Sequence, residues 1–263
     1  MCGNVRYDLH SSRYPFLEPS NVETYFLAME VLDNLPHDKI SRCPHTGDLL
    51  QAEVVSSLSS SSNEHVEHFV PLTDPLLQTI LHTLPQYAPF PSQKNPQWIP
   101  TIACGLLMEL LQLRPNSHIL LADFDNLPPP DLPVKSISSS SYAMAEGEPL
   151  VTCMKDQDHE SYLTAPLLSD ILFPTNFPNL AAFVNKLVTV PKKDTKKETP
   201  QHPCGNRQRV KIWKQSEFLW EMGHEEVLQT ESWISGYSPL IHDFGNCSVL
   251  TVCPETPTNS NKV

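Results

Sequence analysis

Three short runs of apolar residues constrain the fold of this chain more than any other feature of its sequence. They are Tyr25–Val31 (YFLAMEV), His118–Asp123 (HILLAD) and Ser248–Cys253 (SVLTVC), and a proline follows each of them closely. The apolar residues are nearly continuous and do not alternate with polar ones. Continuous apolarity over five or six residues is typical of a strand that is covered on both faces. We therefore expect an α/β fold in which helices cover both sides of a sheet.

Helices are expected between these strands. Asp74 and Pro75 precede an apolar segment at residues 76–85 and are suited to the N-cap and the first helical position. Residues 101–113 (TIACGLLMELLQL) repeat apolar side chains at helical spacing and lead directly into the second apolar run. That order predicts a crossover to a neighbouring parallel strand. Residues 211–223 (KIWKQSEFLWEMG) are expected to form a later helix that ends at a glycine.

Other segments lack apolar periodicity and are expected to be insertions in one domain that spans residues 1–254. They lie near residues 56–65 and 135–160, which contain serine runs, and near 191–206, which is rich in lysine. The lysine-rich segment is expected to be a solvated loop, with contact to an acidic partner as the alternative. Residues 255–263 are expected to form a disordered tail.

The charge and motif content excludes several classes of protein. Lys and Arg total 18 against 30 Asp and Glu, and the formal charge of -12 repels nucleic acid and anionic lipid. The sequence contains no glycine-rich phosphate loop, no G-x-G-x-x-G motif and no serine-hydrolase elbow. No apolar run is long enough for a membrane span, and the first residues resemble neither a signal peptide nor a mitochondrial presequence.

The cysteines and histidines predict no metal site. The seven cysteines are scattered without a C-x-x-C pair, which favours a reducing compartment. Cys43 with His45, and His65 with His68, have spacings that metal ligands use, but neither pair has a second pair to match it. We expect these side chains to be polar residues of loops.

An acidic turn after the first apolar run is the strongest candidate for a functional site. It carries Glu30, Asp33, His37 and Asp38. Ligands of open α/β sheets bind beyond the carboxyl ends of the strands, where acidic residues can hold a ribose or a cationic group. A partly buried carboxylate there can also act as an acid or a base. The alternative is that Asp33 or Asn34 only caps the next helix or stabilises the turn.

Several motifs, taken in order, resemble the MidA-type family of mitochondrial protein arginine methyltransferases, also called complex I assembly factor 7, and most closely its fungal branch. The resemblance covers most of residues 22–253. It is carried by residues 27–40 (LAMEVLDNLPHDKI), 118–128 (HILLADFDNLP), 170–177 (DILFPTNF), 215–223 (QSEFLWEMG) and 236–244 (GYSPLIHDF).

The resemblance implies a class I, Rossmann-like methyltransferase fold that binds S-adenosylmethionine at the carboxyl edge of the sheet. The family transfers the methyl group to an arginine of a complex I subunit in the mitochondrial matrix and supports complex I assembly. On this basis Glu30 and Asp33 are the expected catalytic residues, and His37 and Asp38 are expected on the substrate side. Met29 and Glu30 are expected next to the cofactor.

The family's glycine-rich loop and its second acidic motif would precede Met1. We therefore expect an N-terminally incomplete fold that binds S-adenosylmethionine weakly or not at all, because glycine lets the backbone approach the cofactor closely. The alternative function is a non-catalytic assembly or scaffold fragment that has lost the cofactor loop. A mitochondrial presequence would also lie upstream, so the matrix location is implied by the resemblance alone.

Overall fold

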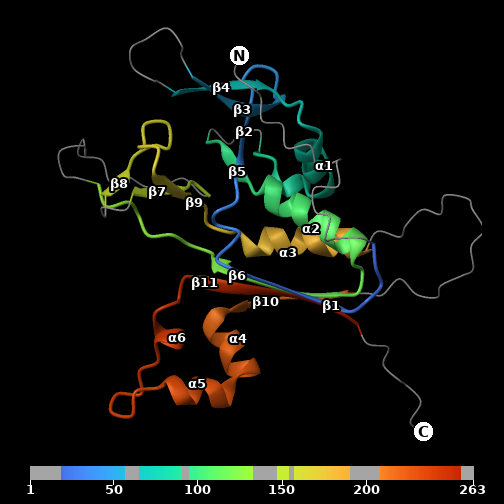
Figure 1. Ribbon diagram of the computed structural model, residues 1–263. Helices are drawn as coiled ribbons and strands as arrows, with labels where there is room; N and C mark the ends of the chain where they lie inside the picture. Colours follow the sequence, from blue (N-terminus) through green and yellow to red (C-terminus); the bar gives the residue numbers. More distant parts are fainter. Residues whose placement is uncertain are drawn as a thin grey trace, which may run out of the picture.

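The computed structural model describes residues 19–56, 65–90, 95–132, 147–153, 157–189 and 208–255. Within them the chain forms three β-sheets, with helices on both sides of the central one (Figure 1). The expected insertions near 56–65 and 191–206 and the expected tail lie almost entirely outside these ranges. The expected insertion at 135–160 is described only in part, and its described part contains two strands.

The central sheet, sheet A, has the strand order β1-β6-β11-β10. β1 and β6 are parallel, with Thr24 opposite Ser117, and β11 is antiparallel to both β6 and β10. The three expected apolar strands are confirmed as β1, β6 and β11. The bounds are Thr24–Met29 for β1, Ser117–Phe124 for β6, Gln208–Lys214 for β10 and Cys247–Pro254 for β11.

The expectation of a helix over residues 211–223 is wrong in its first part. Residues 211–214 belong to β10, where Lys211 lies opposite Thr251 of β11. The helix α4 begins only at Gln215 and ends at Met222, with Gly223 as its C-cap as expected. The cause is tertiary packing, because residues 208–214 together pair with the edge of β11, and KIWK forms the last four residues of that strand.

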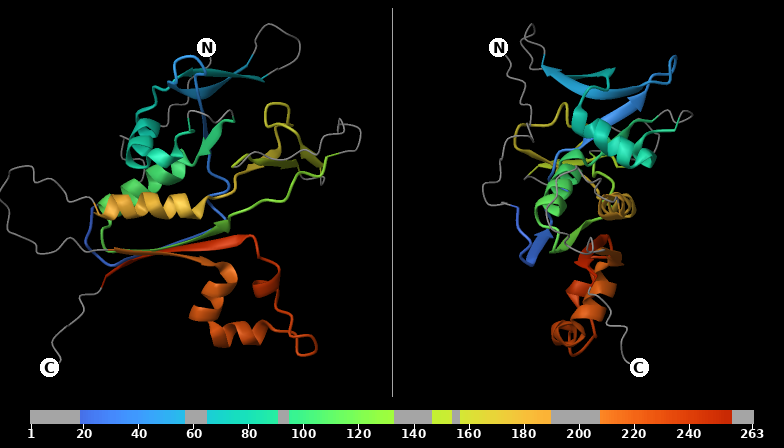
Figure 2. Two further views of the ribbon diagram at one scale, coloured as in Figure 1. Left: turned by 180° about the vertical axis from the view of Figure 1, so that it is seen from behind. Right: turned by 90° about the vertical axis from the view of Figure 1, so that its right-hand side faces the viewer.

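Two groups of helices cover sheet A from opposite sides (Figures 1 and 2). One side carries α1, α2 and α3, and the other carries α4, α5 and α6. The expected N-cap is confirmed, since the Asp74 carboxylate accepts a hydrogen bond of 2.7 Å from the Leu77 backbone N–H. The bounds are Pro75–Thr83 for α1, Thr101–Leu113 for α2, Phe177–Thr189 for α3, His224–Thr230 for α5 and Pro239–His242 for α6.

The main core lies between sheet A and the helices α1 to α3. Its largest fully buried side chains come from all of these elements, and each contributes about 1.5–3 kcal/mol by leaving water. They include Leu77, Ile80, Leu107, Ile119, Phe177, Leu180, Phe183 and Leu250.

β1 is the edge strand of sheet A, and the expectation that it is covered on both faces is wrong. Phe26 and Ala28 pack against the core, whereas Tyr25, Leu27 and Met29 are 67%, 75% and 59% exposed. The helices α4 to α6 lie over β10 and β11 (Figure 2). In the described residues no element covers the outer face of β1 or pairs with its second edge. The expectation of two covered faces therefore describes β11, and most of β6, but not β1.

Two smaller sheets, which the sequence analysis did not predict, lie beyond the carboxyl ends of β1 and β6 (Figure 1). Sheet B has the order β4-β3-β2-β5 and sheet C the order β8-β7-β9, all antiparallel. A 3-10 helix, η1 (Pro85–Tyr87), follows α1. The strands are β2 (Asp38–Arg42), β3 (Leu49–Ser56), β4 (His65–Pro71), β5 (Gln97–Ile99), β7 (Leu150–Cys153), β8 (Gln157–His159) and β9 (Ser169–Leu172).

Candidate functional site

The carboxyl ends of β1 and β6 lie side by side and carry the acidic turn. Met29 is opposite Ala122, and the Glu30 backbone N–H donates to the Ala122 carbonyl at 2.9 Å, so the ladder extends one residue past β1. Asp123 belongs to the end of β6. The sequence-based expectation that the turn stands at this edge of the sheet is confirmed.

Asp123 anchors the turn through its buried carboxylate. Its Oδ2 accepts hydrogen bonds from the backbone N–H groups of Leu32 at 2.7 Å and Asp33 at 3.3 Å, and its Oδ1 accepts one from Phe124 at 2.8 Å. The side chain is only 1% exposed. Burial raises the pKa of Asp123, and the negative charge of Asp33 adds to this effect. Asp123 therefore fixes the path of the chain between the first strand and the residues that follow.

Asp33 is buried next to this anchor. Its carboxylate accepts a hydrogen bond of 2.7 Å from the Asn34 side-chain amide, and burial raises its pKa. Its backbone carbonyl accepts a hydrogen bond of 2.9 Å from Phe173, and the neighbouring Thr175 N–H donates to Phe124. The segment 173–175, which we call the strap, is thus bonded to the ends of both strands. Asp33 lies under the strap and is 3% exposed, so in this conformation it is closed to a large ligand.

Glu30 is the open carboxylate of the turn. It is exposed, and its φ of 53° places it in the left-handed region. In the described residues it is the only non-glycine with a positive φ. Such a conformation costs an L-residue about 1–2 kcal/mol, and strain of this kind clusters at functional sites. Exposed Met29 precedes Glu30 and adds apolar surface to the same edge of sheet A. We call this edge, at the carboxyl end of β1, the rim.

Glu30→Gly is expected to raise the free energy of unfolding by about 1 kcal/mol, because glycine adopts a positive φ without steric cost. Glu30→Ala, which keeps the strain and removes the carboxylate, is expected to leave stability within about 0.5 kcal/mol of the original chain. Urea denaturation of the three proteins measures both values. A loss of stability in Glu30→Gly would show that the left-handed conformation carries no strain.

The substrate-side candidates, His37 and Asp38, lie further from the rim. The His37 ring stacks on Phe173 with centroids 4.2 Å apart, and its Nδ1–H donates to the Leu35 carbonyl at 3.0 Å. Burial lowers the pKa of His37 to about 4, so the ring is neutral at pH 7. Asp38 lies in β2, where burial raises its pKa and its carboxyl bonds to Thr101 at the start of α2. Asp38 thus connects β2 with the start of α2.

Acidification from pH 6.5 to 4 is expected to lower the free energy of unfolding through His37 by about 2–3 kcal/mol. The unfolded His37 gains its proton near pH 6.5 and the folded one only near pH 4, so protons favour the unfolded chain between these values. His37→Phe keeps the ring stack and removes the titration. Urea denaturation at several pH values should therefore show a steeper acid loss in the original chain. Equal slopes in the two proteins would show that His37 does not cause the acid loss. The raised pKa values of Asp33 and Asp123 favour the folded chain in acid, and they are common to both proteins, so they cannot produce a difference between them.

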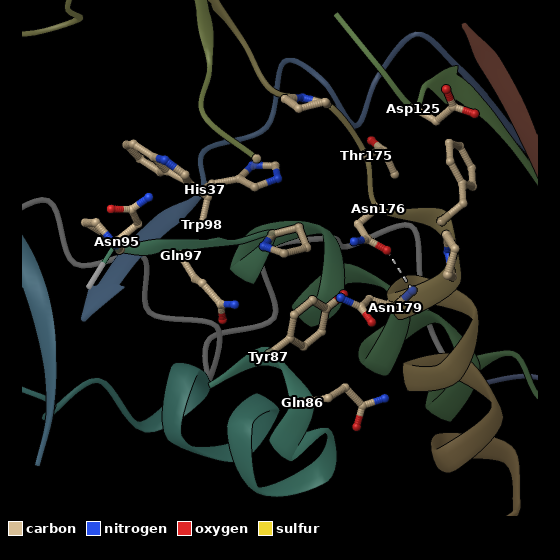
Figure 3. Close-up of a pocket in the computed structure, with 16 residues that line it drawn as sticks. His37, Gln86, Tyr87, Asn95, Gln97, Trp98, Asp125, Thr175, Asn176 and Asn179 are labelled. Atoms are coloured by element: carbon tan, nitrogen blue, oxygen red, sulfur yellow. Dashed lines mark hydrogen bonds between the residues drawn. The ribbon is translucent and has the colours of Figure 1, made fainter. Parts of the chain in front are cut away.

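A cavity of about 510 Å³ opens beside the strap (Figure 3). Four separate parts of the chain form most of its wall. They are His37, residues 86–87 of η1, residues 95–98 with Pro100, and residues 174–179 with the start of α3. Asp125, two residues after Asp123, and Gly147 complete it. Of the predicted site residues only His37 lines this cavity, whereas Met29, Glu30, Asp33 and Asp38 do not. The sequence analysis does not predict the other lining residues as part of a site, although residues 173–177 (FPTNF) belong to one of the motifs that it names.

Neither a metal centre nor a membrane-spanning helix is found in the described ranges. Within the residues that the structure describes, no three His, Cys, Asp or Glu side chains gather in a way that could hold an ion. None of the helices in the described ranges is long and apolar enough to cross a membrane.

Comparisons with known proteins point to one family. Residues 4–192 match the model of a family described as "putative S-adenosyl-L-methionine-dependent methyltransferase". Two solved structures of COG1565 superfamily proteins from Burkholderia thailandensis resemble the chain, each with a TM-score of 0.56 and 13% sequence identity. One is described as a "likely methyl transferase" bound to S-adenosyl-homocysteine, and the other is a native structure. No curated protein matches the sequence.

The structural similarity covers most of this chain and part of its relatives. It includes 90% of the chain and 55% of the S-adenosyl-homocysteine complex, and 89% and 56% for the native structure. The chain therefore spans little more than half the length of these relatives. The similarity shows that these proteins share a mixed α/β fold with the chain.

Proposed function

Since the chain belongs to the family of S-adenosyl-L-methionine-dependent methyltransferases whose model it matches, we propose that it acts as a protein arginine N-methyltransferase of the MidA type. In this proposal the methyl acceptor is an arginine of a complex I subunit, the reaction takes place in the mitochondrial matrix, and it supports complex I assembly. The proposed fold is the class I, Rossmann-like fold, with β1 and β6 as its parallel pair and β10 and β11 at its antiparallel edge.

The observation that carries the proposal is an exposed carboxylate, that of Glu30, near two buried ones at the ends of adjacent parallel strands. Glu30 is exposed, whereas Asp33 and Asp123 are buried and fix the turn from which it projects. A guanidinium presents a planar fork of N–H donors and binds a carboxylate through two hydrogen bonds. The turn therefore suits a cationic, planar acceptor better than an anionic one.

S-adenosyl-L-methionine supplies, when bound, a methyl group on a positively charged sulfur. Glu30 would orient the guanidinium N–H groups and accept the proton that the nitrogen gives up as its new bond to carbon forms. Asp33 and Asp123 act as positioning residues, since both are too buried to meet the acceptor in this conformation.

The described residues fit the acceptor better than the donor. The residues of this chain that we propose to lie next to the donor are Met29 and Glu30. The sequence has no glycine between Glu30 and Thr46, nor between Asp125 and Glu146, so the turns after β1 and β6 lack the residue that allows close approach of the backbone to a nucleotide. The family resemblance, and not a donor cradle in the described residues, supports the cofactor assignment.

The alternative function is a non-catalytic assembly or scaffold module. It is favoured by the same glycine-free turns and by the uncovered outer face of β1, whose apolar residues are typical of an interaction surface.

Two measurements on the 263-residue chain separate these functions. Calorimetric titration with S-adenosyl-L-homocysteine should give a saturable heat, with a weak dissociation constant because the donor is incompletely enclosed. Incubation with S-adenosyl-L-methionine that carries a tritiated methyl group, together with isolated complex I subunits, should label an arginine that mass spectrometry identifies. Absence of binding at millimolar ligand, together with absence of label, would overturn the enzyme and support the scaffold. Label on lysine alone would overturn the arginine assignment.

A further inference from the structure

The cavity beside the strap is lined chiefly by neutral hydrogen-bonding groups and flat apolar surfaces. Carboxamides are the commonest polar group in its wall, and they come from several elements. They are Gln86, Asn95, Gln97, Asn176 and Asn179 (Figure 3). Between them lie the rings of Tyr87, Trp98 and Phe177, and four prolines. We call this cavity the amide pocket.

The described part of the amide pocket's wall is unsuited to anions. Among the residues that the structure describes, no Lys or Arg lines the pocket. Asp125, the one carboxylate among the described lining residues, is bonded to Lys214 and to the Ser248 hydroxyl, and His37 is neutral at pH 7. The described wall would therefore offer phosphate and carboxylate ligands no counter-charge.

The start of α3, which forms one wall, offers no free backbone donor either. The Asn176 side chain accepts a hydrogen bond from the Asn179 N–H at 3.0 Å, and its carbonyl accepts one from Leu180 at 3.0 Å. The Phe177 N–H donates to the Thr175 carbonyl, and Pro178 has no N–H. The donors that helix starts commonly give to anions are thus all used, and recognition falls to side chains.

Unused polar atoms remain at the wall. The Thr175 hydroxyl is buried and has no hydrogen-bond partner among the described residues, although the strap that carries it is fixed by the Thr175 N–H bond to Phe124. Buried polar atoms without partners are uncommon, and a bound water, an ion or a functional role is a usual reason for them. The side chains of Gln86 and Asn179 likewise make no hydrogen bond within the described ranges and stand at the pocket.

From these features we propose that the amide pocket binds an extended peptide segment. Each peptide bond presents one donor and one acceptor, and each carboxamide offers the same two groups. Proline and aromatic surfaces pack against the side chains and turns of extended peptides, as they do in other peptide-binding grooves. The volume lies within the range of about 300–1,000 Å³ that is usual for ligand sites.

The position of the pocket connects it with the acidic turn. The strap forms part of its wall, and the same strap bonds to Asp33 and to the end of β6. A peptide held there would lie next to the rim that carries Glu30. The identification of the bound peptide as the segment with the methyl-accepting arginine rests on the proposed function. The binding of a peptide in the pocket does not depend on that function.

The test uses the capped pentapeptide acetyl-Ala-Ala-Arg-Ala-Ala-amide and its analogue with norleucine in place of arginine. Nuclear magnetic resonance of the 15N-labelled chain should show saturable shifts of the side-chain amide signals of Gln86, Asn95 and Asn179 with both peptides. The double variant Gln86→Ala/Asn179→Ala is expected to bind about tenfold more weakly, from two lost hydrogen bonds. Asn185→Ala, on the same helix but away from the pocket, is the matched control and should leave binding unchanged.

The possible results separate this proposal from the proposed function. No shifts at 10 mM peptide, or shifts that map elsewhere, would overturn peptide binding in the pocket. Shifts of the same amide signals by S-adenosyl-L-homocysteine, with displacement of the peptide, would assign the pocket to the cofactor and overturn the proposal. Peptide shifts in a chain that fails to methylate arginine would keep the peptide site and reject the enzyme.

Discussion

Replacement of Glu30 by glutamine is expected to slow methyl transfer to arginine by about 100-fold, the lower end of what a positioned acid or base contributes. Glutamine has the same shape and can still accept a hydrogen bond, but it has no charge to pair with the guanidinium and cannot take up its proton. Because Glu30 is exposed and its carboxylate bonds to no described residue, the change should leave the fold intact. Initial rates with the tritiated donor measure the effect.

Two controls make this result specific to the rim. Glu53→Gln, which also removes an exposed carboxylate but lies in β3, should leave the rate unchanged. The affinity for S-adenosyl-L-homocysteine in Glu30→Gln should stay within about threefold of the original value, because the sulfur of this ligand is uncharged and glutamine keeps the size of the side chain next to it. A rate that differs less than twofold from the original would remove Glu30 from the reaction.

Asp123→Ala is expected to lower the free energy of unfolding by about 4 kcal/mol. The substitution removes the acceptor of three backbone N–H groups, those of Leu32, Asp33 and Phe124, and each buried donor without a partner costs about 1–3 kcal/mol. Release of a buried charge offsets part of that sum. Asp123→Asn keeps one oxygen acceptor and should lose about half as much. Urea denaturation at pH 7 measures both changes.

Asp170→Ala is the matched control for this series. Asp170 is exposed in β9, and its removal should change stability by less than about 0.5 kcal/mol. If Asp123→Ala lost no more than this control, the turn after β1 would be held by the strap instead of the carboxylate.

The features that the sequence predicted well depend on neighbours along the chain. The N-cap at Asp74, the extent of α2 and the apolar strands all follow from residue types within one element. The acidic turn is of the same kind, since Glu30 and Asp33 follow a strand directly and share its end. Such local patterns need no knowledge of what packs against them.

The wrong predictions concern which face of a strand is covered and which segments pair or pack together in space. Tyr25, Leu27 and Met29 belong to a continuous apolar run, yet the run alone does not show that they lack a covering element. The strand pairing of residues 211–214 depends on β11, about 40 residues later. The amide pocket takes its wall from segments between residues 37 and 179, so no single stretch contained its signal. The motif at 173–177 is recognisable in the sequence, but it does not predict a cavity.

The pairing of β1 with β6 also sets the order in which sheet A can assemble during translation. Thr24 meets Ser117, which the ribosome adds 93 residues later. At synthesis rates of about 5–20 residues per second, the first strand waits roughly 5–20 s for its neighbour. For that interval its apolar side chains have no native contact within sheet A, and the nascent chain carries an unpaired apolar strand that is open to aggregation until β6 emerges.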